Sequence, residues 1–364
     1  MDLILKPTVR CNFKCTFCSS THLSDDATEI VELADIDAFI KRYPWTNTVI
    51  LNGGDPLMMK PEYYFAIIDI LEKYDCLANL SFTSNLWAFY KKPLKWAPLF
   101  RHPRVAMTTS FQYGDARLKG DGTVFTEDEF VDVTDLFFKY VGYRPDFIAV
   151  IDKSNEDTVI ATVELAKRLG VEAKVNYAVA SGPVVENRGV LMGNANTMYT
   201  QADMYEQYLA IHDAGLAEYE YSTKQMLIRL RHGATTCPLA RDCDSGIRSM
   251  QPGRNYHSCG AFGDDLQYPI DFDREMAGEF FTPLQNREEL HSMKDACNAC
   301  PMFAICNGCK KTIADTKRLG LTEHHCRKMK SLAPRIIALN GMSEYLEPTP
   351  YEDESVQLIP ALSI

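Results

Sequence analysis

The 364-residue chain lacks the features that would place it in or across a membrane. No apolar run approaches the roughly 18–20 residues that a membrane-spanning helix needs. No secretory signal precedes the first motif, because residues 1–6 are too few and Asp2 adds a negative charge. These absences predict a cytoplasmic protein with no membrane partner.

The chain also lacks the surplus of positive charge that is typical of nucleic-acid-binding proteins. Its 38 Lys and Arg residues are outnumbered by 49 Asp and Glu residues, and the formal net charge is −11 at pH 7. Because binding to a phosphate backbone usually needs a basic face, we expect no nucleic-acid partner. Internal repeats and low-complexity tracts are absent too, which favours an ordinary globular protein.

Cysteine is plentiful, with twelve residues that cluster towards the two ends of the chain. In a cytoplasmic protein such clusters are more often metal or redox ligands than a disulfide framework. Three of them form the motif Cys11-x3-Cys15-x2-Cys18. Three thiolates on a [4Fe–4S] cluster leave one iron open to a small molecule. The alternative is a zinc knuckle, for which His22 is the only nearby fourth ligand.

Short β-branched runs alternate with amphipathic stretches through the first 215 residues or so. We expect strands at residues 2–6, 47–52, 78–83, 104–110, 146–151 and 172–177. Helices are expected at 33–43, 61–74, 127–141, 156–170 and 201–215, with a weaker one around 92–101. Six βα units imply a parallel sheet with right-handed crossovers, and they fall short of the eight in a full barrel. The predicted fold is therefore α/β, an open, partial (β/α)6 TIM-like barrel.

Polar residues follow several of the expected strands. The second strand ends in Asn52-Gly53-Gly54-Asp55-Pro56, where glycines allow a close backbone approach and a carboxylate can accept hydrogen bonds from an ammonium group. Ligands bind at the carboxyl ends of parallel strands, although a plain turn is the alternative here. Other strand-end candidates are Ser84, Asn85 and Ser110.

The βα pattern breaks after about residue 220, and eight cysteines follow. They are Cys237, Cys243, Cys259, Cys297, Cys300, Cys306, Cys309 and Cys326. Eight thiolates suffice for two fully ligated [4Fe–4S] clusters, and two structural zinc sites are the alternative. Cys76 remains outside both groups and is expected to be a buried thiol that packs as a small hydrophobe.

Together these motifs resemble those of the radical S-adenosylmethionine (radical SAM) superfamily with a C-terminal SPASM extension. The N-terminal triplet is similar to the superfamily's cluster signature, with Phe17 in the place of the aromatic residue that shields the cluster. Residues 53–56 are similar to the GGEP motif, with Asp55 in the position of the Glu. The resemblance implies a radical SAM partial barrel at 1–220, a cysteine-rich SPASM domain with auxiliary clusters at 221–335 and an acidic tail at 336–364.

The resemblance also implies the cofactors and the residues that hold them. The cofactors are S-adenosyl-L-methionine, one radical SAM [4Fe–4S] cluster on Cys11, Cys15 and Cys18, and two auxiliary [4Fe–4S] clusters. One auxiliary cluster takes Cys237, Cys243, Cys259 and Cys309, and the other takes Cys297, Cys300, Cys306 and Cys326. The residues implied to bind S-adenosylmethionine are Gly53, Gly54, Asp55, Pro56, Ser84, Asn85, Ser110 and Asn194. Asp264 and Asp265 follow Cys259 and are candidates for a catalytic base, with a solvated acidic turn as the alternative.

The implied function is that of an oxidoreductase that uses a 5′-deoxyadenosyl radical to abstract hydrogen from its substrate. The expected substrate is a ribosomally made precursor peptide that undergoes crosslinking or side-chain oxidation. The chain begins directly on its first strand, so we expect a leader peptide to be recognised either by a separate peptide-recognition protein or by the enzyme's own surface. A reductant such as flavodoxin or ferredoxin is a further expected partner. The alternatives are a dehydrogenase or decarboxylase of a small metabolite such as a sugar or nucleoside, and a zinc-stabilised binding protein without catalysis.

Overall fold

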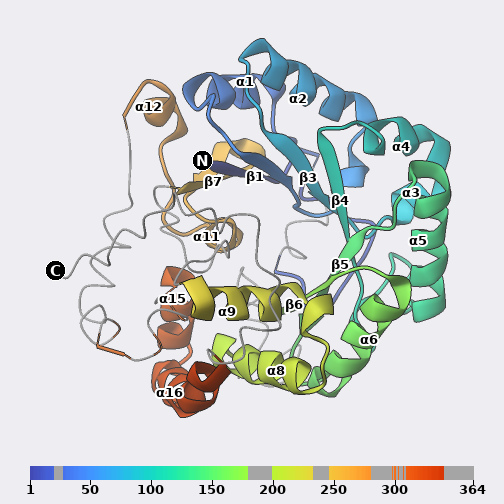
Figure 1. Ribbon diagram of the computed structural model, residues 1–364. Helices are drawn as coiled ribbons and strands as arrows, with labels where there is room; N and C mark the ends of the chain where they lie inside the picture. Colours follow the sequence, from blue (N-terminus) through green and yellow to red (C-terminus); the bar gives the residue numbers. More distant parts are fainter. Residues whose placement is uncertain are drawn as a thin grey trace, which may run out of the picture.

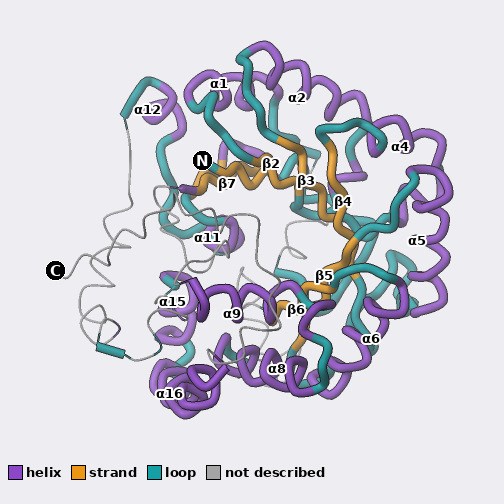
Figure 2. Tube along the Cα trace, in the orientation of Figure 1, coloured by secondary structure: helices purple, strands orange, loops and turns teal. Residues whose placement is uncertain are grey.

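The computed structural model contains a curved sheet at its centre (Figure 1 and Figure 2). It describes residues 1–19, 28–178, 199–232, 246–279, 297, 299–300, 302, 306 and 309–339. Within these residues the sheet has eight strands in the order β6-β5-β4-β3-β2-β1-β7-β8. All neighbouring pairs are parallel except β7 and β8. The strands are β1 (Asp2–Leu5), β2 (Thr48–Leu51), β3 (Asn79–Thr83), β4 (Val105–Ser110), β5 (Asp146–Ile151), β6 (Ala173–Tyr177), β7 (Ile247–Gln251) and β8 (Asn255–His257).

The first six strands confirm the sequence prediction to within a residue or so at each end, as does the parallel α/β arrangement. The sequence did not predict β7 and β8. They come from the region expected to form a separate C-terminal domain, yet β7 pairs with β1 and extends the same sheet. The expected boundary at residue 220 stays a prediction, but the chain on both sides of it contributes to one sheet.

Helices cover the outer face of the sheet (Figure 1). They are α1 (Leu33–Arg42), α2 (Pro61–Lys73), α3 (Trp87–Lys91), α4 (Pro93–Phe100), α5 (Glu127–Val141) and α6 (Val159–Leu169). The weak crossover of the sequence is thus two short helices, α3 and α4, which meet just before Pro93. A capping box at Thr126 starts α5, and Gly142 in the left-handed region ends it.

Side chains alternate between the two faces of each strand. Outward positions such as Leu3, Val49, Leu80 and Phe82 are fully buried beneath the helices. Inward positions are partly exposed and often polar; they include Ser81, Thr83, Thr108, Ser110, Lys174 and Asn176. The concave side of the sheet is therefore polar and accessible, which suits a ligand site at the carboxyl ends of the strands.

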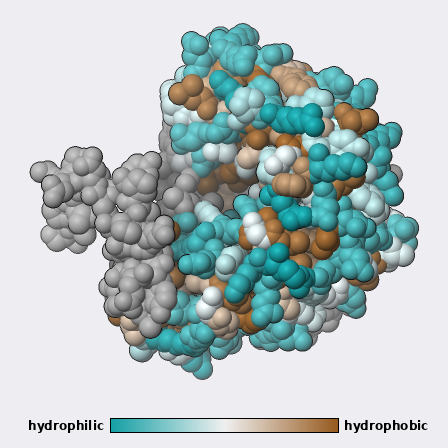
Figure 3. Space-filling view, turned by 45° about the vertical axis from the view of Figure 1, so that its right-hand side comes forward, coloured by the Kyte–Doolittle hydropathy of each residue, from teal (hydrophilic) through white to brown (hydrophobic). Residues whose placement is uncertain are grey.

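The remaining helices belong to the later part of the chain. They are α8 (Gln201–Asp213), α9 (Tyr221–His232), α11 (Gly260–Asp264), α12 (Phe272–Met276), α15 (Lys310–Arg318) and α16 (Thr322–Ala338). α16 packs on α8 through a small core that includes Leu209, Met329 and Ile336. Hydrophilic residues dominate the face shown in Figure 3, and none of the described helices is long and apolar enough to span a membrane.

Candidate functional site

The three N-terminal cysteines lie on the loop that follows β1. Cys15 is buried, whereas Cys11 and Cys18 are partly exposed. The loop is fixed against the segment between β4 and α5 by backbone hydrogen bonds from Lys14 to Leu118 (2.8 Å) and from Thr16 to Ala116 (3.0 Å). The segment between β4 and α5 thus lies against the cysteine loop on one side.

Cys11 and Cys15 lie close enough to Cys18 for its charge to affect their pKa. Burial raises the pKa of Cys11 and Cys15, and for both the charge of Cys18 raises it further. No three His, Cys, Asp or Glu side chains in the described part of the chain are arranged to hold a single metal ion. The thiolates of a [4Fe–4S] cluster bind different irons and so stand farther apart than the ligands of one ion. Three interacting thiols on one loop fit such a cluster, and a positive charge beside them would favour their ionised form.

That positive charge is Arg117, which the sequence analysis did not single out. Its guanidinium is buried and donates to Gln112 Oε1 from Nε (3.0 Å) and from Nη2 (2.5 Å), and from Nη1 to Ser110 Oγ (3.0 Å). It lies 5.2 Å from the ring centroid of Phe17. Burial lowers the pKa of Arg117, and the negative charges of all three cysteines oppose that shift. Ser110, a predicted cofactor residue, therefore lies beside the cysteine loop through Arg117.

Gly53 and Gly54 bring the end of β2 against the cysteine loop. The amide of Gly54 donates to the carbonyl of Thr8 at 3.2 Å, and that of Asp55 to the carbonyl of Arg10 at 2.8 Å. A Cβ atom at Gly54 would lie within 2.6 Å of backbone atoms of Val9 and Arg10. The sequence predicted that these glycines let the backbone approach a ligand closely, and that stays a prediction. In the described structure they lie against the backbone that leads to Cys11.

Asp55 is buried, and its carboxylate is hydrogen-bonded within the protein. It accepts from the amide of Leu57 (2.8 Å), the hydroxyl of Ser84 (3.0 Å) and the amide of Asn85 (3.0 Å). Burial raises the pKa of Asp55 to about 6, and these hydrogen bonds oppose the rise. The carboxylate thus joins the ends of β2 and β3. Its contact with the ammonium group of a ligand stays a prediction.

Asn85 connects this junction to the cysteine loop. Its amide nitrogen Nδ2 donates to Asn12 Oδ1 at 2.7 Å and lies 4.0 Å from Cys11 Sγ. The structure therefore brings together Asp55, Ser84, Asn85, Ser110 and the three cysteines at the carboxyl ends of β1 to β4. Asn194 lies outside the described residues, and its predicted role is untested.

The two candidate bases, Asp264 and Asp265, are both ion-paired. Asp264 pairs with the buried Lys6 and also accepts from the hydroxyl of Ser19 at 2.8 Å. Asp265 accepts from Lys311 Nζ at 2.5 Å, and the same ammonium group pairs with Asp315. Each carboxylate is thus already engaged by a lysine of the protein. The arrangement favours a structural role for both residues, in which Asp264 links the cysteine loop and β1 to α11.

The described C-terminal cysteines fall near one another in two places. Burial raises the pKa of Cys259, and the charge of Cys309 raises it further. Burial likewise raises the pKa of Cys297, which the charges of Cys326 and Cys300 also raise. Cys306 Sγ lies 3.7 Å from His325 Nε2, next to Cys326 in sequence. Cys237 and Cys243 lie outside the described residues, and the division of the ligands between two clusters stays a prediction.

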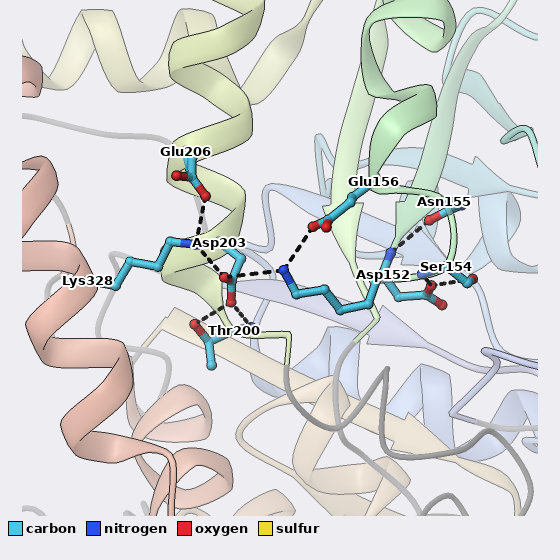
Figure 4. Close-up of polar contacts among 9 residues, drawn as sticks. Asp152, Ser154, Asn155, Glu156, Thr200, Asp203, Glu206 and Lys328 are labelled. Carbon is cyan, nitrogen blue, oxygen red and sulfur yellow. Dashed lines mark hydrogen bonds and ion pairs between the residues drawn. The ribbon is translucent and has the colours of Figure 1, made fainter.

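The helix that carries Cys326 is fixed to the first part of the chain by an ionic network around the buried Asp203. Figure 4 shows Lys328 of α16 reaching Asp203 and Glu206 of α8, with Nζ to oxygen distances of 2.6 and 2.7 Å. Burial opposes ionisation of Asp203, but hydrogen bonds from Lys328 and Thr200 outweigh it and hold the pKa of Asp203 below its ordinary value. Lys153, from the loop after β5, adds a weaker ion pair with Asp203 at 4.0 Å.

We expect the change Lys328→Met to lower the free energy of unfolding by about 2 kcal/mol, because Asp203 would lose its main counter-charge while remaining buried. The neighbouring change Arg327→Met removes an equal charge from the same helix, but from an exposed pair with Glu323. That control should cost no more than about 0.5 kcal/mol. Urea unfolding under anaerobic conditions measures both values, and equal losses would show that the network does not anchor α16.

The chain is similar to a known protein family in sequence and to several solved structures in fold. The Radical SAM superfamily profile matches residues 5–179. No curated protein is a significant match to the sequence. Among solved structures, "Native anSMEcpe with bound AdoMet" is similar with a TM-score of 0.69 and 14% identity, over 93% of this chain and 99% of that one. "Native anSMEcpe with bound AdoMet and Cp18Cys peptide" is similar with a TM-score of 0.67 and 14% identity, over 94% and 99% of the two chains.

A third similar structure is "Streptococcus suis SuiB bound to precursor peptide SuiA", with a TM-score of 0.56 and 15% identity over 84% of this chain and 71% of that one. At these identities the likeness establishes the shared fold. It extends beyond the residues matched by the family profile, into the part of the chain that contains β7, β8 and the C-terminal cysteines.

Proposed function

We propose that the chain is a radical SAM oxidoreductase that modifies a ribosomally made peptide, starting from the match of residues 5–179 to the Radical SAM superfamily profile. The observation that carries the proposal is the meeting of the three cysteines with Arg117, Asn85 and the Asp55 junction at the carboxyl ends of β1 to β4. This edge of the sheet is where parallel α/β proteins bind their ligands.

In this proposal Cys11, Cys15 and Cys18 hold a [4Fe–4S] cluster, and S-adenosylmethionine binds beside it along residues 53–56. When bound, the pair supplies a 5′-deoxyadenosyl radical that abstracts a hydrogen atom from the substrate. The protein keeps the site in place through the hydrogen bonds of Asp55 and Ser84, and Asn85 lies directly against Cys11. Arg117 places a positive charge beside the thiolates and holds Ser110 in position.

We further propose that the eight C-terminal cysteines hold two auxiliary [4Fe–4S] clusters of the SPASM type. The placement of Cys259 near Cys309, and of Cys297 near Cys300 and Cys326, supports two separate centres. Burial raises the pKa of four of these thiols, and the charge of a metal centre would favour their ionised form; the four are Cys259, Cys297, Cys309 and Cys326. Such centres would accept the one electron that the substrate radical gives up as it is oxidised.

A peptide substrate is supported by the similar structures of anSMEcpe and SuiB, each of which has been determined with a bound peptide. The polar, partly exposed concave side of the sheet offers donors and acceptors for a peptide backbone. A separate recognition protein and a reductant such as flavodoxin belong to this proposal as partners.

The test is to incubate the reconstituted enzyme with S-adenosylmethionine, a chemical reductant and candidate precursor peptides under anaerobic conditions. We expect 5′-deoxyadenosine release to rise when the true peptide is added, and the peptide mass to show the loss of two hydrogens. Stimulation only by sugars or nucleosides would replace the peptide assignment with the small-metabolite alternative. Absence of 5′-deoxyadenosine under every condition would contradict the radical SAM assignment itself.

A further inference from the structure

One stretch next to the cysteine loop is positively charged, although the chain as a whole is acidic. Residues 76–114 contain five Lys and Arg residues and no Asp or Glu, in a protein with a formal net charge of −11. Three of the five lie together at the junction of α3 and α4 and are exposed: Lys91, Lys92 and Lys95. Such a local reversal of charge is typical of a surface that attracts an acidic partner.

Trp87 connects this surface to the cysteine loop. Lys91 Nζ lies 4.6 Å from the centroid of the Trp87 ring, which is partly exposed. The Trp87 amide donates to Asn85 Oδ1 at 2.8 Å, and Asn85 Nδ2 lies 4.0 Å from Cys11 Sγ. The Trp87 ring also meets the ring of Phe13, with centroids 6.3 Å apart. A short series of bonded and packed groups therefore runs from the lysines to the first of the three cysteines.

Acidic side chains also lie near this surface, because α5 packs against both α3 and α4 and carries the exposed residues Asp128, Asp132 and Asp135. Lys119 Nζ lies 5.5 Å from the centroid of the same Trp87 ring, and it pairs with Glu129. Asp121 is a second acidic side chain that interacts with Lys119. The excess charge thus comes from α3 and α4, while these acidic groups follow β4 and belong to α5 and the segment before it.

We infer that the Trp87 surface, formed by Trp87 with Lys91, Lys92 and Lys95, docks the acidic redox protein that donates electrons to the N-terminal cluster. This inference rests on the proposed function, because a donor is needed only if that cluster is present. Complementary charge would speed the encounter, and the series Trp87, Asn85, Cys11 would keep the electron path short. The donor loses one electron and the cluster gains one, so no proton needs to move.

The position of the surface separates electron entry from electron exit. Figure 1 shows α3 and α4 on the opposite side of the molecule from α15 and α16. Cys326 lies on α16, and Cys309 directly precedes α15. A donor at the Trp87 surface therefore reaches the N-terminal cysteines before the C-terminal ones, and an acceptor at the C-terminal cysteines would not compete for the same face.

The test is the rate at which a reduced acidic flavodoxin reduces the reconstituted enzyme, followed by stopped-flow absorbance of the cluster. We expect Lys91→Glu/Lys95→Glu to lower the second-order rate constant at low salt by about tenfold or more, and to remove its decrease with ionic strength. The neutralising double change Lys91→Gln/Lys95→Gln should give an intermediate rate. The matched control is Lys139→Glu/Lys167→Glu, which reverses two exposed lysines that likewise lie over aromatic rings but belong to α5 and α6.

Photoreduced deazaflavin is a small reductant that needs no docking surface, so it shows whether the cluster itself can be reduced in each variant. It should reduce the cluster at the same rate in all variants. Equal flavodoxin rates in Lys91→Glu/Lys95→Glu and the control would overturn the docking assignment. The docking assignment would also be overturned if Lys91→Glu/Lys95→Glu weakened only peptide binding. If deazaflavin bleaches no cluster even in the unchanged chain, the proposed function fails, and it does so independently of the lysines.

Discussion

A chain with Cys15→Ala is expected to lose 5′-deoxyadenosine formation completely while keeping most of its iron. Cys15 is the buried thiol of the N-terminal triplet, and two remaining thiolates do not hold a cluster with one open iron. The eight C-terminal cysteines are untouched, so about eight of about twelve irons per chain should remain after reconstitution. Iron analysis and chromatography of the reaction products measure the two effects together.

The matched control for this prediction is Cys76→Ala. Cys76 is also fully buried, but its thiol faces the carbonyl oxygen of Thr46 at 3.6 Å and belongs to no cysteine group. We expect the control to keep its full iron content and its activity, at a cost of about 1 kcal/mol in stability from the small cavity. Retention of 5′-deoxyadenosine formation in Cys15→Ala would remove the triplet from the proposed site.

The second large effect is expected for Gly54→Ala. The added Cβ would overlap the backbone of Val9 and Arg10, and a backbone contact cannot be relieved by a side-chain rotation. The hydrogen bonds from Gly54 to Thr8 and from Asp55 to Arg10 would break as the loop moves. We expect a loss of about 3 kcal/mol or more in the free energy of unfolding, together with loss of the N-terminal cluster.

Gly246→Ala serves as the control for Gly54→Ala, because no atom of the described residues lies within 4 Å of the added Cβ and the backbone there is compatible with alanine. It should change neither stability nor iron content appreciably. If Gly54→Ala bound S-adenosylmethionine and formed all clusters as well as this control, the end of β2 would not hold the cysteine loop in place. Calorimetry of the reconstituted proteins, with iron analysis of the same samples, decides between these outcomes.

Most of the barrel could be predicted from the sequence because its strands and helices have strong local patterns. β7 could not, since Ile247-Arg248-Ser249-Met250-Gln251 mixes apolar and polar residues and is buried throughout. Its Arg248 is tolerated in the interior because the guanidinium pairs with Glu275 at 2.8 Å, and Tyr43 and Tyr256 donate to the same carboxylate. Partners so distant in sequence leave no local signal.

The residues of the candidate site also differ in whether the sequence could predict them. The cysteine spacings and the glycines at 53 and 54 are local motifs, and the sequence therefore indicated them. Arg117 is a single basic residue in a loop, and its importance depends on Gln112, Ser110 and the cysteines folding around it. The ion pairs of Asp264 and Asp265 likewise join residues 258 and 46 positions apart, so the sequence could not show that lysines neutralise both carboxylates.

The most direct test of the account is the content of iron, labile sulfide and zinc per chain after anaerobic reconstitution. Three [4Fe–4S] clusters predict about twelve irons, about twelve sulfides and negligible zinc. About four irons would confine the cluster to the N-terminal triplet and contradict the auxiliary centres. Zinc without iron would contradict the proposed enzyme as a whole.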